Sequence, residues 1–224
     1  MQVELTPDDW AIGAMLGHAR RLSNENKRNK SRDRGNAKNI HVDLMGSMGE
    51  IIAFKIFQRY VSEESMKSQM ENLFGVGGGS RFTGADFYLD LHPKKLRLDA
   101  KTYDCDPSKK FFAINAKKHN SLKGKCDGYS CLLIPKYSKT AFLIPNVPCS
   151  DVDRWQLKSL GKYGDPSFNM PISQFVEKYA TKSVVNDLRR SEFFDRGLIK
   201  ASLNSPVVRD RFFSICPEAK VLLS

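Results

Sequence analysis

The sequence predicts an α/β fold: a mixed central β-sheet flanked by helices, with helical extensions at the N- and C-termini. Three observations indicate it: a long apolar helix pattern from about residue 43 to 60, a strand hairpin at 85–103, and two unbroken apolar runs at 129–134 and 141–144. Continuous apolarity is typical of strands covered on both faces. We expect an N-terminal helix and basic segment (1–41), a core (42–150), and a mainly helical C-terminal extension packed on the core (151–224).

The N-terminal helix is predicted by its start and by its spacing. Thr6 can cap it, Pro7 suits the first helical position, and Asp8 and Asp9 complement the helix dipole. Apolar residues then recur at helical spacing as far as Leu22. Residues 23–41 lose this pattern and are rich in Asn, Lys and Arg, which predicts a loop or a helix ordered only by a partner.

The second predicted helix, residues 43–60, is apolar around most of its circumference and is therefore expected inside the protein. Glu50 lies in its middle, where an acid is costly to bury unless it is paired or bound to a cation. The alternative places Glu50 on a solvated stripe beside Lys55. A more polar helix is expected at 63–73, and the glycine-rich residues 75–80 are predicted to be a flexible connection, because no Gly-Lys-Ser/Thr follows.

A β-hairpin is predicted from residues 85–91, a turn at 92–95, and residues 96–103. Side chains alternate along a strand, so Asp99 and Lys101 share one face of the second strand with Tyr103, while Leu98 and Ala100 share the other. Antiparallel pairing brings Asp86 of the first strand close to Asp99. A helix at about 115–122 then leads to the two apolar strands.

Composition limits the classes of protein to consider. Hydrophobic residues make up 41% and charged residues 27%, and the mean hydropathy is −0.44, values typical of a soluble globular protein. No apolar run reaches the roughly 18 residues of a membrane span, and the start lacks a secretory signal, so we expect a cytoplasmic protein without membrane contact. The five cysteines have irregular spacing and are expected to be reduced thiols.

The net charge of +11 and the pI near 9.4 favour a polyanionic partner, with nucleic acid first. Asp86, Asp99 and Lys101 would face such a partner with a specific chemistry. Two converging carboxylates and a few waters give the oxygen-rich site that Mg²⁺ prefers. A lysine two residues along the same strand face is well placed to orient a water molecule.

These residues resemble the motifs of the PD-(D/E)xK, or restriction-endonuclease-like, nuclease superfamily, whose core runs helix, three-stranded meander, helix, strand. Gly84-Ala85-Asp86 corresponds to the "PD" motif, with Ala85 in place of proline, and Asp99-Ala100-Lys101 to "(D/E)xK". Glu50 is similar to the glutamate that the first core helix often contributes. The resemblance spans about residues 42–145. Two further matches to the short pattern, Glu25-Asn26-Lys27 and Glu218-Ala219-Lys220, lack an acid-bearing strand before them.

The resemblance implies a metal-dependent DNA endonuclease that hydrolyses phosphodiester bonds with Glu50, Asp86, Asp99 and Lys101 as its catalytic residues. Mg²⁺, for which Mn²⁺ can substitute, would be held by the three acids, and Lys101 would orient or activate the attacking water. Double-stranded DNA is the expected partner, and a homodimer making paired cuts is a common arrangement in such families. The expected nucleic-acid contacts are Arg28, Lys30, Arg32, Arg34, Lys117 and Lys118.

Several alternatives remain open at this point. The chain could be a catalytically inactive DNA-binding module of the same fold, an RNA-directed nuclease, or a structural protein whose basic surface only aids solubility. The hairpin could be exposed, with ordinary solvated charges. His119 as a general base is a weaker interpretation, because Lys101 and metal-bound water would already fill that role. Tyr103 and Trp155 could stack on bases, but an aromatic residue in this context is more often in the core or at its rim.

Overall fold

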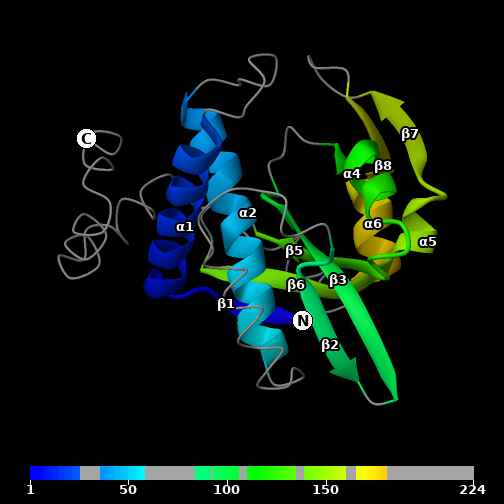
Figure 1. Ribbon diagram of the computed structural model, residues 1–224, viewed down its shortest axis with the longest axis horizontal. Coiled ribbons are helices and arrows are strands. Elements are labelled where there is room, and N and C mark those ends of the chain that lie inside the picture. The colour runs from blue at the N-terminus through cyan, green and yellow to red at the C-terminus, as the bar shows by residue number, and fades with distance from the viewer. Residues whose placement is uncertain are drawn as a thin grey trace.

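The computed structural model describes residues 1–25, 36–58, 84–91, 93–105, 110–134, 139–159 and 165–180. They form a mixed α/β structure with two β-sheets and packed helices (Figure 1). The helix expected at 63–73, the glycine-rich connection at 75–80 and everything after residue 180 lie outside the described residues. So do four of the expected nucleic-acid contacts, Arg28, Lys30, Arg32 and Arg34.

The larger sheet has five strands, and only its central pair is parallel. Its order is β1 (Gln2–Glu4), β6 (Thr140–Pro148), β5 (Gly128–Leu133), β3 (Lys94–Tyr103) and β2 (Phe87–Leu91). β3 and β5 run parallel, and the other neighbours are antiparallel. The predicted mixed sheet and hairpin are thus confirmed, although the turn is shorter than expected because β2 and β3 pair as far as Leu91 and Lys94. The strand β1 was not predicted.

Two long helices, α1 (Pro7–Glu25) and α2 (Asn36–Phe57), lie side by side (Figure 1). The apolar surface of α2 packs on one face of the sheet, where Met48 and Ile52 join Leu98 and Leu132 in one buried cluster. Of the two interpretations of residues 23–41, the loop is wrong at both ends, since residues 23–25 continue α1 and residues 36–41 begin α2. Helices in proteins are stabilised mainly by tertiary packing, which local composition does not reveal.

The predicted start of α1 is confirmed in detail. Asp9 N donates to Thr6 Oγ1 at 3.2 Å, while Asp9 Oδ2 accepts from both Thr6 N and Thr6 Oγ1 at 2.8 Å. This reciprocal arrangement is a capping box with aspartate in the glutamate position. Lys55 Nζ of α2 lies 3.1 Å from Asp9 Oδ2, so an ion pair ties the start of α1 to the end of α2.

The second sheet contains β4 (Phe111–Asn115), β8 (Pro166–Pro171) and β7 (Gln156–Ser159). Three short helices, α4 (Ala116–Ser121), α5 (Cys149–Val152) and α6 (Ile172–Tyr179), accompany it. The expectation of a mainly helical segment after residue 151 is therefore wrong for the described part, and β4 was not predicted either. The rings of Phe112 and Phe175 stack with centroids 4.2 Å apart, so strand pairing and packing between distant residues decide these elements.

β5 separates two apolar clusters. Tyr129, Cys131 and Leu133 face the second sheet, whereas Leu132 lies in the cluster beneath α2. All six residues of β5 are buried, which confirms that this unbroken apolar strand is covered on both faces. Among the described residues, no helix is both long and apolar enough to cross a membrane.

The packing of α1 on α2 depends on Gly17. A Cβ at this position would lie 2.7 Å from Leu44 N and 2.8 Å from Leu44 Cα, and helix backbone cannot yield locally. We expect Gly17→Ala to lower the free energy of unfolding by about 1–3 kcal/mol, as overpacking does, despite the better helix propensity of alanine. Urea denaturation measures this change.

Gly46→Ala in α2 is the matched control. Apart from its chain neighbours and the backbone of its own helix, no atom of the described residues lies within 4 Å of a Cβ built there. This variant should gain about 0.5–1 kcal/mol from propensity alone. Equal stabilisation by both alanines would contradict the close helix crossing.

Candidate functional site

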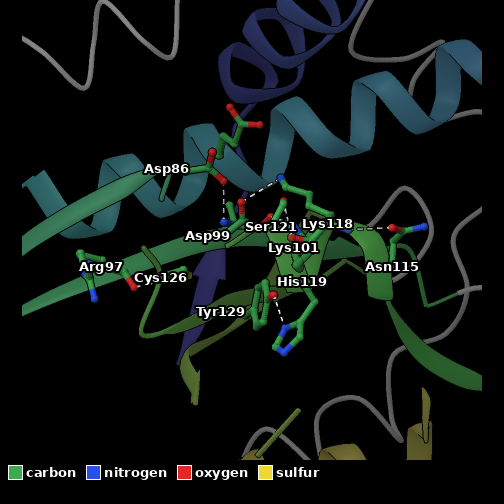
Figure 2. A network of polar contacts seen from close by, with 12 residues as sticks. Asp86, Arg97, Asp99, Lys101, Asn115, Lys118, His119, Ser121, Cys126 and Tyr129 are labelled. Carbon is green, nitrogen blue, oxygen red and sulfur yellow. Dashed lines mark hydrogen bonds and ion pairs between the residues drawn. The ribbon is translucent and has the colours of Figure 1, made fainter. Parts of the chain in front are cut away.

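The centre of the site is Asp99, whose side chain is completely buried at 0% exposure. Lys101 Nζ donates to Asp99 Oδ2 and, at 3.0 Å, to Ala100 O, while Lys118 Nζ lies 2.8 Å from Asp99 Oδ1 (Figure 2). Burial opposes ionisation of this carboxyl, but the charges of Lys101 and Lys118 outweigh it and lower the pKa of Asp99. The alternative of an exposed hairpin with ordinary solvated charges is therefore wrong for Asp99.

Lys118 reaches Asp99 from α4, which begins directly after β4. Asn115 caps this helix, its Oδ1 accepting from Lys118 N at 3.0 Å (Figure 2). Burial opposes the charge of Lys118, but Asp99 and Asp86 outweigh it and raise the pKa of the ammonium. The lysine side chain is still 51% exposed, so it contacts both the buried carboxylate and solvent. Its neighbour Lys117 is exposed on the same helix.

Asp86 was expected within the first strand of the hairpin, but it stands one residue before β2. Phe87 pairs with Leu98, which places Asp86 beside Asp99, and Asp86 Oδ2 accepts from Ala100 N at 2.8 Å. Burial, the largest cause, and the charges of Asp99 and Glu50 together raise the pKa of Asp86 to about 7, against the opposing charges of Lys118 and Lys101. A carboxyl in this position is only partly ionised at neutral pH.

Glu50 is presented by α2 and is paired with Arg20 of α1. Arg20 Nη1 lies 2.8 Å from Glu50 Oε1 and Arg20 Nη2 lies 2.6 Å from Oε2, a bidentate contact with both side chains about three-quarters buried. A Cβ on the neighbouring Gly49 would overlap Thr102 Oγ1, so only glycine lets α2 approach β3 this closely. The acid is thus paired, as its position in an apolar helix requires, rather than solvated beside Lys55.

The three acids do not form a ready ligand set. Among the described residues, no three His, Cys, Asp or Glu side chains are grouped so that they could hold a metal ion. Each acid is held by another partner instead: Glu50 by Arg20, Asp99 by Lys101 and Lys118, and Asp86 by Ala100 N.

The donor chemistry nevertheless fits a hard divalent cation. All three groups are carboxylates, and the pKa of Asp86 is raised by burial and then by the negative charges of Asp99 and Glu50. Shared binding of one ion requires Glu50 to leave Arg20 and Asp99 to loosen its contacts with lysine.

His119 lies beside the site and contacts Tyr129, whose ring lies next to Lys101. It is 1% exposed, and its Nδ1 lies 2.7 Å from Tyr129 Oη (Figure 2). Its Nε2 lies 3.2 Å from Asp153 Oδ1. The Tyr129 ring in turn lies under Lys101, whose Nζ is 5.5 Å from the ring centroid. Both imidazole nitrogens have protein partners, which favours a supporting role over that of general base.

The proposed base-stacking residues Tyr103 and Trp155 belong to the apolar core. They are 8% and 6% exposed and pack around Phe112. Neither ring is presented to an incoming base, so the core interpretation holds for both.

Two partnerships were missed from the sequence: Arg20 with Glu50, and Lys118 with Asp99. The first joins residues 30 positions apart, and no local spacing pattern reports such a contact. The second could have been suspected, because a lysine in the first turn of a crossover helix between parallel strands lies near their shared end. No protein-family model, curated protein or solved structure matches this chain.

Proposed function

We propose that this protein is a metal-dependent DNA endonuclease of the PD-(D/E)xK, restriction-endonuclease-like type. The observation that supports this most is the complete burial of Asp99 between two lysines and beside Asp86. Charged clusters of this kind are expensive to bury and are often no better for stability than apolar packing. A buried group of acids and lysines with a strongly shifted pKa is therefore a candidate catalytic centre.

Each residue has a distinct role in the proposed reaction. Mg²⁺, or Mn²⁺ in its place, held by Glu50, Asp86 and Asp99, would offset charge on the scissile phosphate and help to deprotonate the attacking water. Lys101 orients that water, because Asp99, Ala100 O and the Tyr129 ring fix its ammonium group.

Lys118 is the group that binds the substrate phosphate. Its ammonium is anchored at Asp99 while half of its side chain faces solvent. Lys117, exposed one position earlier in α4, adds a contact to the neighbouring backbone.

The experiment that tests this function incubates the protein with supercoiled plasmid, linear duplex DNA, single-stranded DNA and RNA. Each substrate is tested with Mg²⁺, with Mn²⁺ and with EDTA. Nicking or linearisation of plasmid that requires a divalent cation supports the proposal. Binding to DNA without cleavage under any of these conditions would leave the inactive DNA-binding module, and preferential cleavage of RNA would leave the RNA-directed nuclease.

The basic segment after α1 is predicted to hold the DNA backbone. If Arg28, Lys30, Arg32 and Arg34 contact phosphates, replacing all four with glutamine should flatten the slope of log affinity against log salt by about 0.9 for each lost contact. Fluorescence anisotropy with a labelled duplex at several salt concentrations gives this slope. An unchanged slope would remove the segment from the DNA interface.

A further inference from the structure

The guanidinium of Arg20 occupies the carboxylate that the proposed function assigns to a metal ion. We propose that Arg20 is a phosphate-binding residue held in reserve by Glu50, which releases it to the substrate backbone when a divalent cation takes the carboxylate. This inference rests on the proposed function and adds a coupling to it. Metal binding would create one more phosphate contact, so the protein would bind DNA more tightly once the ion is in place.

The geometry of the contact between Arg20 and Glu50 suits such an exchange. Both terminal nitrogens of Arg20 engage both oxygens of Glu50, at 2.8 and 2.6 Å. The planar fork that matches a carboxylate in this way also matches two oxygens of a phosphate. Because Arg20 contacts both oxygens of the Glu50 carboxylate, a metal ion and Arg20 would compete for the same two oxygens.

The surroundings of Arg20 place its charge at the acidic cluster. Burial opposes its ionised state, but the hydrogen bond with Glu50 and the charges of Glu50, Asp86 and Asp43 outweigh burial and raise its pKa. The charges of Asp99 and Glu50 also raise the pKa of Asp86, after the larger effect of burial. The guanidinium therefore lies within electrostatic reach of the proposed reaction centre, and 24% of the side chain still faces solvent.

The position of Arg20 in the chain points the same way. It lies in the last two turns of α1, and the basic segment predicted to hold the DNA backbone follows this helix. The close crossing at Gly17 fixes these turns against α2. A released Arg20 would add a phosphate contact beside the acidic cluster.

The test compares wild type with Arg20→Met in two binding measurements. Calorimetric titration of the DNA-free protein with Mn²⁺ should show about three- to tenfold tighter metal binding in Arg20→Met, because no cation competes for Glu50. Affinity for a labelled 20-base-pair duplex should be unchanged in EDTA. In Ca²⁺, with intact DNA verified on a gel, the variant should bind more weakly, and its salt slope should fall by about 0.9.

Lys55→Met is the matched control, because Lys55 forms the other ion pair between α1 and α2, with Asp9. It should leave the Mn²⁺ affinity and both DNA measurements unchanged. Arg20→Lys keeps the charge without the bidentate fork and should fall between wild type and Arg20→Met. It also serves as the test variant if Arg20→Met does not fold.

The outcomes separate this inference from the proposed function. Unchanged or weaker Mn²⁺ binding in Arg20→Met, or equal loss of DNA affinity in EDTA and Ca²⁺, would overturn the exchange and leave Arg20 as a clamp between helices. Mn²⁺ binding by Asp99→Asn as tight as that of wild type would instead remove the metal site, and the exchange with it.

Discussion

Asp99→Asn is expected to reduce metal-dependent DNA cleavage by about a thousandfold, the largest effect we predict. Loss of this carboxylate would remove a proposed metal ligand and the anchor of Lys101 and Lys118 together. Transition-state stabilisation by a bound metal amounts to several kcal/mol, and each 1.36 kcal/mol corresponds to about a factor of ten in rate. Initial rates of plasmid linearisation in Mg²⁺ provide the measurement.

The asparagine variant separates chemistry from folding, because the amide preserves the shape of the buried side chain. Circular dichroism and gel filtration should show a folded protein. Duplex binding in EDTA should be intact or stronger, since a negative charge near the phosphate has been removed. Wild-type cleavage by folded Asp99→Asn would show that the site is wrongly assigned. The exposed Asp90 on β2 supplies the control, and Asp90→Asn should cut at the wild-type rate.

Asp86→Asn is expected to stabilise the metal-free protein at pH 8 and to have little effect near pH 4. The pKa of Asp86 is about 7 in the folded protein against a usual 3.8, so the folded state binds the extra proton between these values. That contribution to stability is present below about pH 4 and is lost as the pH rises through 7. The asparagine amide carries no charge, so the variant loses no stability at this position as the pH rises. At pH 8 its free energy of unfolding should therefore exceed that of wild type by a few kcal/mol, to an order of magnitude.

Urea denaturation in EDTA at pH 4, 6 and 8 measures this dependence. The amide oxygen can still accept from Ala100 N, so the hydrogen bond to β3 is retained and only the charge changes. A stability difference between variant and wild type that stays constant over the three pH values would contradict a raised pKa at Asp86. With Mn²⁺ the wild type should be the more stable of the two proteins, because Asp86 offers the metal a charged ligand that the asparagine variant lacks.

Much of the architecture follows from patterns local to the sequence. The Thr6 cap, the apolar helix α2, the hairpin alternation and the doubly covered strand β5 all depend on residues within a few positions of each other. Local patterns failed where long-range pairing decides the structure, as in the second sheet, where β4 pairs with β8 more than fifty residues later. The early start of α2 has the same cause, because packing rather than composition stabilises its first turns.

The sequence by itself determined that Asp99 and Lys101 share one strand face and that the hairpin brings Asp86 beside them, because strand geometry leaves little freedom over so few residues. It did not determine what those charges contact. Only the tertiary structure decided that Asp99 is buried against Lys118 and that Arg20 forms an ion pair with Glu50. The reason is physical: ion pairs form between whichever charged groups the packed helices bring together, and the spacing of residues along the chain does not encode that distance.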